Sequence, residues 1–373
     1  MLRDEIIDQL SKLELAKYRF TARVQDRLTL PKFKGSAFRG GFGHAFRRVT
    51  CSFKGRSSCE GCLLRESCLY SYVFETPMPE GAEIFTKNPY APHPFVIEPP
   101  LEERESYEPG DQLSFNLVLI GRAIQYFPYF LVGIEELGKM GLGERTPPGR
   151  RGRYRLEEVT SVGLSPEGEG AEVEVEVKVK VYSAREGRIL SEGLVVNGGD
   201  LILMSALGEQ SLDPKRVRVT FLTPARFHHQ PGRKGPKGSS REPEWYVGQP
   251  GSPIPRLEFH ILLEALLRRL SLLLYFHCGQ RLQLDFTELL ERAQEVTIEE
   301  DQLQWTELAR YSSRQKRWIK LGGLTGQISF AGRLGPFLPY LLLGEQIHVG
   351  KGTAFGLGQM KLEFNSKEKE AKT

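Results

Sequence analysis

Four cysteines near the N-terminal end of the chain have the residue type and part of the spacing of a metal site. Cys51, Cys59, Cys62 and Cys68 are separated by seven, two and five residues. The close pair can place two thiolates on one ion, and the outer two can complete a tetrahedral set. Because four thiolates leave no open position, we expect a structural cofactor that pins an insert over residues 51–68. Zinc is favoured over an iron–sulfur cluster, and thiols that bind no metal are the remaining alternative.

A glycine-rich stretch near the C-terminal end could approach phosphate groups through its backbone amides. It reads Gly-Lys-Gly-Thr-Ala-Phe-Gly-Leu-Gly over residues 350–358. It is not a nucleotide-binding P-loop, because Lys351 is followed by Gly352 rather than by serine or threonine. Glycine lets a backbone come close to a ligand, but the same residues also form ordinary turns. The pattern therefore indicates either a phosphate-binding loop or a turn.

Basic residues are concentrated in three stretches of a chain whose total charge is nearly balanced. The 373 residues carry 51 Lys and Arg against 47 Asp and Glu, a net charge of +4. Residues 16–58 hold eleven basic residues against one acidic residue, residues 214–241 hold eight against none, and residues 308–351 hold seven against one. This segregation is typical of a surface that binds a polyanion, although each run alone could be a solvated face.

Aromatic residues lie among these cations, and two predicted strands place arginines on one face. The rings could stack on bases of single-stranded RNA or belong to the core. They are Tyr18, Phe33, Phe38, Phe227, Tyr311 and Trp318. Arg19 and Arg23 alternate with apolar residues in one segment, and Arg216 and Arg218 do so in another. Because alternate residues of a strand share a face, the sheet face is the favoured binding surface.

The elements that must position these residues follow the same order in both halves of the chain. In the first half we expect strands at 17–25, 113–120 and 172–182, a helix that Ser36 caps and that runs to Arg48, and a helix at 123–137 that bends at Pro128. In the second half we expect strands from 215, at 327–330 and at 359–364, and helices at 257–276 and 338–343. This order predicts an α+β fold of two tandem ferredoxin-like domains, at 15–212 with the Cys-rich insert and at 213–366, followed by a disordered tail at 367–373.

Composition excludes several classes of protein and indicates a compartment. Five cysteines are too few for a disulfide scaffold, and Cys278, after an apolar helix, is expected in the core. The first residues lack the apolar core of a signal peptide, and no apolar run is long enough for a membrane span. We therefore expect a cytoplasmic protein with no membrane partner, in which clustered thiols stay reduced.

Several of these motifs together resemble one protein family. They are Gly322 to Gly326, the loop Gly350 to Gly358, Phe221 to Pro224 with Arg226, the helix around Leu262 to Leu270, Arg310 to Gln315, and Lys34 to Gly40. The set is similar to the CRISPR-associated RAMP superfamily, and within it to the endoribonucleases that process CRISPR precursor RNA. One departure is His348, at a position where the family often has glycine.

The resemblance implies two ferredoxin-like domains that resemble RNA-recognition motifs, and cleavage of CRISPR repeat RNA into mature guide RNAs without a catalytic metal. The ribose 2′-hydroxyl attacks the adjacent phosphate and leaves a 2′,3′-cyclic phosphate. This chemistry needs a group that moves protons near neutral pH and cations that stabilise the phosphorane. The alternative is a RAMP subunit that binds guide RNA in a CRISPR effector complex without cutting it. A metal-stabilised nucleic-acid-binding protein unrelated to CRISPR is the third interpretation.

The resemblance also implies roles for particular residues. His44 on the first helix is the candidate for proton transfer, because the family often carries a catalytic histidine there, and Arg47 or Lys54 would stabilise the phosphorane. His228 and His229 are the reserve candidates, and His260 and His277 are expected to be packed structural residues. The predicted RNA-binding residues are Arg19, Arg23, Arg39, Arg216, Arg218, Arg226, Arg314, Gly350, Lys351, Gly356 and Gly358.

Overall fold

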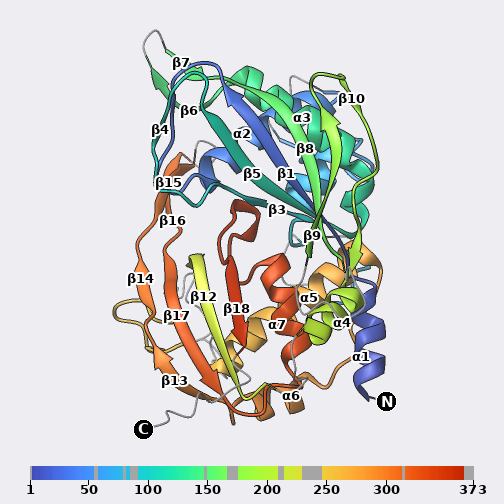
Figure 1. The fold of residues 1–373 in the computed structure, drawn as a ribbon, viewed down its shortest axis with the longest axis vertical. Coiled ribbons are helices and arrows are strands. Elements are labelled where there is room, and N and C mark those ends of the chain that lie inside the picture. The colour runs from blue at the N-terminus through green and yellow to red at the C-terminus, as the bar shows by residue number, and fades with distance from the viewer. Residues whose placement is uncertain are drawn as a thin grey trace. The chain divides into compact units, whose positions relative to one another are not determined.

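The computed structural model describes residues 2–53, 58–78, 81–84, 91–146, 149–165, 175–208, 214–228, 246–312 and 316–364. The backbone divides into two compact units (Figure 1). Unit 1 comprises residues 1–204 and 271–282, and unit 2 comprises residues 205–270 and 283–373. The predicted tail at 367–373 lies outside the described residues.

Unit 1 is built on an antiparallel sheet with the strand order β10-β9-β8-β1-β5-β3, and β11 also pairs with β1. Its elements are α1 (Leu2–Ser11), β1 (Glu14–Val24), β2 (Leu28–Thr29), α2 (Gly35–Thr50), the π-helix η1 (Ser71–Glu75), β3 (Phe95–Glu98), β4 (Ser106–Tyr107), β5 (Gln112–Ile120), the 3₁₀ helix η2 (Gly121–Tyr126), α3 (Phe127–Met140), β6 (Leu142–Thr146), β7 (Arg150–Gly152), β8 (Tyr154–Ser165), β9 (Val175–Ser183), β10 (Arg188–Ile189), β11 (Val196–Asn197) and α4 (Gly198–Gly208). Helix α2 connects β1 to β3, and α3 connects β5 to β8. The order β8-β1-β5-β3 is therefore the ferredoxin-like arrangement.

Unit 2 repeats this arrangement with the order β13-β17-β12-β18, and β14 also pairs with β17. Its elements are β12 (Arg216–Ala225), α5 (Phe259–Cys278, whose residues from 271 on belong to unit 1), α6 (Phe286–Ala293), β13 (Thr297–Asp301), β14 (Gln304–Thr306), β15 (Ala309–Ser312), β16 (Arg317–Lys320), β17 (Gly323–Ala331), α7 (Leu338–Ile347), the 3₁₀ helix η3 (Thr353–Phe355) and β18 (Met360–Phe364). Helix α5 connects β12 to β13, and α7 connects β17 to β18. The predicted fold class, α+β with tandem ferredoxin-like domains, is therefore confirmed.

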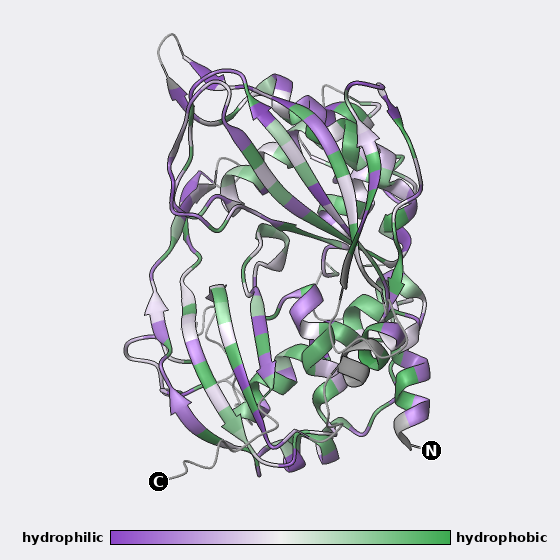
Figure 2. Cartoon of the chain, viewed as in Figure 1, coloured by the Kyte–Doolittle hydropathy of each residue, from purple (hydrophilic) through white to green (hydrophobic). Residues whose placement is uncertain are grey.

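Phenylalanines of α2 form the centre of the core of unit 1. Phe38, Phe42 and Phe46 recur every four residues, so they share one face of the helix, and each is at most 1% exposed. Their neighbours include Phe130 of α3, whose ring centroid lies 5.2 Å from that of Phe46. A Cβ on Gly133 would stand 3.0 Å from the Phe42 ring, so a glycine there lets α3 approach α2 closely. Hydrophobic and hydrophilic residues alternate along the strands of the sheet (Figure 2).

Local signals explain where the predicted elements differ from the observed ones. Strand β1 begins at Glu14 and its apolar residues are buried as predicted. The predicted cap at Ser36 is wrong, because α2 begins at Gly35 after Lys34, and no side chain caps it. The predicted bend at Pro128 is also wrong: this proline lies in the first turn of α3, where its missing N–H has no helical partner to lose. The turn before it is the separate 3₁₀ helix η2.

Two other expectations concern the helices. Cys278 ends α5 and is only half-buried, but burial raises the pKa of its thiol to about 11. His277 is 5% exposed and packed as predicted: its Nε2 donates to the carbonyl of Pro92 at 2.7 Å, and its Nδ1 accepts from the Tyr72 hydroxyl at 3.2 Å.

Over the described part of the chain, we find no helix with both the length and the apolar composition needed to cross a membrane.

Candidate nucleic-acid interface

The glycine-rich loop of unit 2, residues 348–358, joins α7 to β18. Val349 donates its N–H to the carbonyl of Gly358 at 3.0 Å, and this closes the base of the loop. Gly350 and Gly358 both have positive φ, where L side chains are strained. A Cβ at Gly350 would stand 2.6 Å from the carbonyl oxygen of Arg226, and one at Gly358 would overlap that of Val349. The protein's own backbone therefore requires glycine at both positions.

His348 begins the loop at the position where the resemblance led us to expect glycine. Its φ of 63° and ψ of 169° lie in a region that is almost exclusive to glycine, and its side chain is fully buried. Its Nδ1 donates to the carbonyl of Leu357 at 3.2 Å, across the loop. His348 thus holds a backbone conformation that glycine adopts without strain, and its ring fills the base of the loop.

Two predicted RNA-binding residues converge on one tyrosine beside this loop. The guanidinium carbon of Arg226 lies 3.7 Å from the ring centroid of Tyr246, and the Nζ of Lys351 donates to the Tyr246 hydroxyl at 3.2 Å. The backbone N–H of Lys351 donates to the carbonyl of Arg226 at 3.1 Å, and the guanidinium donates to the carbonyl of Lys320. The reserve candidate His228 makes an edge contact with the same ring. Two cations and an imidazole therefore surround Tyr246, and we call these four residues the Tyr246 cluster.

The β15–β16 hairpin carries exposed aromatic residues and contacts the glycine-rich loop. Arg310 lies over the ring of Phe355 at 4.8 Å, and burial lowers the pKa of its guanidinium. Tyr311 and Trp318 face each other across the hairpin and are 52% and 70% exposed. These two rings could stack on bases, whereas Tyr18, Phe38 and Phe227 are core residues at most 2% exposed. The predicted phosphate ligand Arg314 lies outside the described residues.

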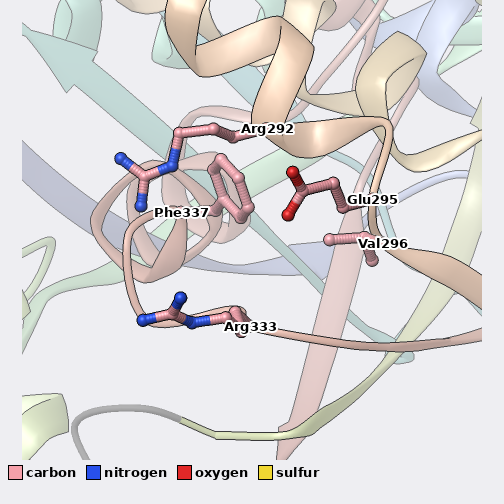
Figure 3. A pocket seen from close by; sticks show the side chains of 5 residues that line it. All are labelled: Arg292, Glu295, Val296, Arg333 and Phe337. Atoms are coloured by element: carbon pink, nitrogen blue, oxygen red, sulfur yellow. The ribbon is translucent and has the colours of Figure 1, made fainter.

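A small pocket of unit 2 lies apart from this loop, between α6 and the segment before α7. Its lining includes Arg292, Glu295 and Arg333 around the ring of Phe337 (Figure 3). Because a carboxylate shares the pocket with the two guanidiniums, the lining does not have the uniform charge of a phosphate site. Arg292 also forms an ion pair with Glu288, at 3.7 Å. We therefore do not assign this pocket to the interface.

The arginines on the two sheet faces are largely neutralised by carboxylates from other strands of the same sheet. The ion pairs join Arg23 to Glu157 at 3.1 Å, Arg216 to Glu299 at 3.0 Å and Arg218 to Glu300 at 3.6 Å. Arg19 donates to the side-chain oxygen of Asn116 at 3.4 Å. Each carboxylate reduces the positive potential that a phosphate would meet, so the Tyr246 cluster is the stronger candidate for an RNA contact. The role of the sheet-face arginines stays a prediction.

Helix α2 of unit 1 carries two of the three predicted catalytic residues, His44 and Arg47. His44 is exposed and makes no hydrogen bond to another described residue. Arg47, one turn later, lies over the ring of Tyr70 with its guanidinium carbon 5.4 Å from the centroid. Lys54 lies outside the described residues. An exposed imidazole can reach a bound strand, but none of the described side chains orients it.

A second histidine of unit 1 is oriented by its neighbours, and sequence reasoning did not single it out. Arg39, which is one of the predicted RNA-binding residues, donates from its Nη2 to the Nε2 of His93 at 3.1 Å. Its guanidinium also lies over the ring of Phe74. Because Nε2 accepts, Nδ1 carries the proton and donates to the hydroxyl of Thr76 at 2.9 Å. No sequence motif marks His93, which lies in an irregular segment before β3.

The four cysteines of the insert line one small cavity in unit 1, together with Arg47 and Phe53. All four thiols are free and half-buried. Burial, with a contribution from Glu75, raises the pKa of the Cys59 thiol. Over the residues that the structure describes, no three His, Cys, Asp or Glu side chains stand close enough to hold a metal ion as placed. The structure therefore brings the predicted ligands to one cavity without forming a coordination sphere.

Comparison with known sequences finds two family matches in this chain. Residues 219–360 match the family described as CRISPR-associated endoribonuclease Cas6. Residues 13–193 match an N-terminal-domain family named AF_1859_N. An uncharacterized protein of Archaeoglobus fulgidus is 32% identical over 113 residues, which are 30% of this chain and 37% of that protein. This chain thus aligns with little more than a third of the curated relative.

Comparison with solved structures finds the same fold in CRISPR-associated proteins. A Cas6 product complex superposes with a TM-score of 0.50 at 16% identity, over 94% of this chain and 99% of that one. A partial Cas6-RT-Cas1–Cas2 complex gives a TM-score of 0.51 at 14% identity, over 95% of this chain but only 47% of that one. At these identities the likeness establishes the fold alone.

Proposed function

Because this chain has the fold of CRISPR-associated RAMP proteins and a Cas6 endoribonuclease match in its C-terminal half, we propose that it cleaves CRISPR repeat RNA to mature guide RNAs. In the proposed reaction the ribose 2′-hydroxyl attacks the adjacent phosphate. The O5′ leaves with a proton, and the products are a 2′,3′-cyclic phosphate and a free 5′-hydroxyl. No metal ion takes part in the proposed chemistry.

The Tyr246 cluster beside the glycine-rich loop is the observation that supports RNA as the ligand. Arg226 and Lys351 lie within the region that matches the Cas6 family, and both contact Tyr246. No ion pair joins Arg226 to a carboxylate within the described part of the chain, so its charge stays available to a phosphate. Guanidinium and ammonium groups around a loop that must stay glycine favour a phosphodiester backbone as ligand.

His44 is the proposed group for proton transfer, and Arg47 or Lys54 is the proposed partner of the phosphorane. The exposed imidazole of His44 can accept the 2′-hydroxyl proton or protonate the leaving oxygen. The guanidinium of Arg47, one helical turn away, could stabilise the charge that develops on the non-bridging oxygens. His93 is the histidine to examine next if His44 is dispensable, because Arg39 and Thr76 already fix its tautomer.

Cleavage of labelled repeat RNA in the presence of EDTA tests this proposal. We expect the parent chain to cleave, a substrate with a single 2′-deoxyribose at the cleavage site to stay intact, and the product to carry a cyclic phosphate. The His44→Ala variant should cleave about 10² to 10⁴ times more slowly, the usual range for loss of a general acid or base. His260→Ala is the matched control and should cleave at the parental rate.

Two results would contradict parts of the proposal. Binding of repeat RNA without cleavage, with and without chelator, would favour the alternative of a non-catalytic subunit that binds guide RNA. Full activity of the His44→Ala variant would exclude His44 from the chemistry.

Association with a CRISPR effector complex and a cytoplasmic location stay predictions. Pull-down from cells would test the first, and cell fractionation would test the second.

We further propose that the four cysteines hold one structural zinc ion. The shared cavity supports this, because modest movements of half-buried thiols could close them around an ion. Zinc bound there would link the chain after α2 to the segment before η1. It would supply folding free energy rather than chemistry.

Metal analysis of the purified protein tests the zinc proposal independently of activity. We expect about one zinc per chain, and little zinc in the Cys62→Ser variant. Cys278→Ser is the matched control, because this thiol lies outside the insert and should not affect metal content. Visible absorbance in fresh protein would indicate an iron–sulfur cluster instead, and metal-free protein with unchanged thermal stability would contradict both.

A further inference from the structure

A fourth group of basic residues lies in unit 1, outside the three basic stretches of the sequence. Between residues 145 and 155 the chain carries five arginines and no acidic residue. They belong to the β6–β7 hairpin and the start of β8, which project from one end of the sheet of unit 1 (Figure 1). Figure 2 shows this hairpin as predominantly hydrophilic.

The strand register places arginines opposite one another at two positions. Arg145 of β6 pairs with Arg151 of β7, and Arg155 of β8 pairs with Arg23 of β1. Like charges directly opposite in an antiparallel pair destabilise it. Exposed and buried residues alternate from 151 to 156, so Arg151, Arg153 and Arg155 share the solvent-facing side.

Three of these guanidiniums have no carboxylate partner among the described residues. Arg153 is held by Asp26 at 2.6 Å, but Arg145, Arg151 and Arg155 form no ion pair or side-chain hydrogen bond with any residue that the structure describes. We call these three the hairpin arginines.

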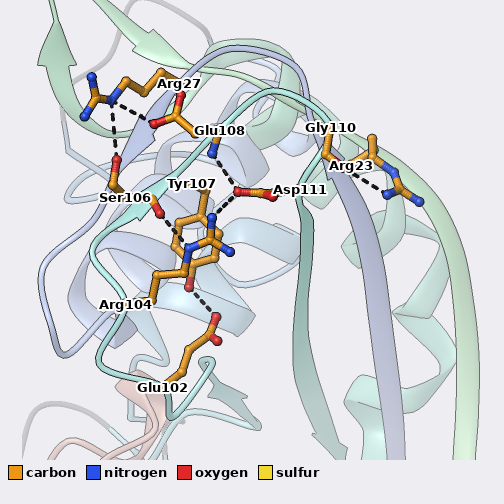
Figure 4. Close-up of polar contacts among 9 residues, drawn as sticks. All are labelled: Arg23, Arg27, Glu102, Arg104, Ser106, Tyr107, Glu108, Gly110 and Asp111. Carbon is orange, nitrogen blue, oxygen red and sulfur yellow. Dashed lines mark hydrogen bonds and ion pairs between the residues drawn. The ribbon is translucent and has the colours of Figure 1, made fainter.

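Nearby arginines of the same unit are engaged, as Figure 4 shows for one end of the sheet. Arg27 pairs with Glu108 at 3.3 Å, and Arg104 pairs with Asp111. Arg23 donates to the carbonyl of Gly110 at 3.0 Å and also pairs with Glu157. Carboxylates therefore neutralise this neighbourhood but leave the hairpin arginines charged and exposed.

The base of the hairpin is fixed by close backbone contacts. A Cβ on Gly141 would stand 2.7 Å from the carbonyl oxygen of Arg151, and one on Gly152 would stand 2.5 Å from that of Arg27. Strand β6 also packs against β2. The hairpin arginines therefore start from a backbone that is already positioned, which reduces the entropy lost when a ligand binds.

We propose that the hairpin arginines form a second RNA-binding site, which holds phosphates of the repeat RNA away from the scissile bond. This proposal rests on the proposed function for the identity of the RNA. Arg145 stands opposite Arg151, and Arg155 lies four residues further along, which is about 13 Å for extended chain, or about two phosphate spacings of one RNA strand. The guanidinium fork suits phosphate oxygens, and a bound polyanion would offset the repulsion between opposed arginines.

The surroundings favour a nucleic acid over an acidic protein as the occupant. Protein interfaces usually contain large apolar or aromatic anchors. Between Val132 and Ile189, no large hydrophobic side chain of the described residues is exposed. The site therefore offers repeated charge without an apolar anchor, which matches a phosphodiester backbone.

The test compares two double variants of the full-length protein. Arg145→Gln with Arg151→Gln removes two hairpin arginines, and Arg185→Gln with Arg188→Gln removes two exposed arginines from the β9–β10 hairpin of the same unit. The dissociation constant for repeat RNA is measured between about 50 and 300 mM KCl. The first pair should weaken binding about tenfold near 0.1 M salt. It should also reduce the slope of the logarithm of the binding constant against log salt by about 1.5, because a protein with fewer phosphate contacts releases fewer counterions when it binds. The second pair should leave both values unchanged.

Two further measurements complete the test. Cleavage at saturating RNA should stay within about twofold of the parent in the Arg185→Gln with Arg188→Gln control pair, because neither residue is placed in the proposed chemistry or RNA contact. Arg145→Lys with Arg151→Lys should retain most of the salt slope, because charge is preserved. An unchanged slope in the glutamine pair, or an equal effect of both glutamine pairs, would overturn this site. Absence of cleavage by every protein, with the slope reduced as expected, would instead contradict the proposed enzymatic function.

Discussion

Comparing Gly350→Ala with Gly251→Ala should distinguish two reasons why the glycine-rich loop needs glycine. One is the close approach of the Arg226 carbonyl to Gly350, and the other is the strain that any alanine has at a positive φ. Gly350 has φ +83°, and a Cβ added to it would stand 2.6 Å from the carbonyl oxygen of Arg226. Gly251, also in unit 2, has φ +77° but no atom within 4 Å of the corresponding position. The two substitutions therefore share the strain of a left-handed alanine, about 1 kcal/mol, and differ in the space available.

The structure sets the size of the expected difference. At 2.6 Å the carbonyl must move, and the same carbonyl accepts a hydrogen bond from the N–H of Lys351 at 3.1 Å. Loss of that bond costs about 1 kcal/mol more, so Gly350→Ala should destabilise unit 2 by about 2 kcal/mol and Gly251→Ala by about 1. For a unit of this size these values correspond to falls in Tm of about 4–8 °C and 2–4 °C. Gly358→Ala, which would overlap the carbonyl of Val349, should be worse than both.

The assay is thermal unfolding of each variant together with its dissociation constant for repeat RNA. Because the carbonyl that must move belongs to Arg226, Gly350→Ala should displace the Tyr246 cluster and weaken RNA binding by roughly tenfold. Gly251→Ala should bind RNA like the parent. Equal stability and equal affinity of the two variants would refute the reasoning, because close approach would then not be what requires glycine.

Three other substitutions give expectations that simple measurements check. Arg269 is buried without a carboxylate partner among the described residues, its Nε donates to the Ile347 carbonyl, and burial lowers its pKa to about 9. Arg269→Leu should therefore raise the free energy of unfolding at pH 7 by about 1–3 kcal/mol. A lower midpoint in urea denaturation would contradict this. Since the unfolded state keeps this proton at higher pH than the native state, parental stability should rise above pH 9 and the gap between the proteins should shrink. Trp318→Ala should leave Tm unchanged and weaken RNA binding about tenfold if the exposed ring stacks on a base. Tyr246→Phe keeps the ring under the guanidinium but loses the hydroxyl that Lys351 contacts, so affinity should fall less than about fivefold, and a larger loss would show that the hydroxyl itself touches RNA.

Periodicity predicted the framework of both units because each core strand has one buried face. The alternation in β1 and β12 is visible in the sequence since apolar residues there face helices while polar residues face away. Hydrophobic spacing also predicted α2 and α5. The β6–β7 hairpin has no such signal, because its arginines face solvent and glycines occupy its close contacts, and only the register reveals it.

The candidate site was predictable where chemistry is local in sequence and not where it depends on partners far along the chain. Glycines and a lysine within one stretch indicated the loop, and the structure adds Arg226 and Tyr246 from two other segments. The charge of a strand arginine cannot be judged from its own strand, since Glu157 and Glu299, which pair with Arg23 and Arg216, come from other strands of the same sheet. The orientation of His93 likewise depends on two other elements.

The distribution of paired and unpaired arginines changes which surface should bind RNA. The chain has 47 acidic residues for its 51 basic ones, and on the sheet faces carboxylates from other strands stand beside the arginines. Hairpins and loops project beyond this pairing, so their guanidiniums, such as those of Arg145 and Arg226, keep their charge for a ligand. The physical consequence is that RNA affinity should depend more on projecting segments than on sheet faces, even though the sheet faces carry more regular arrays of arginine in the sequence.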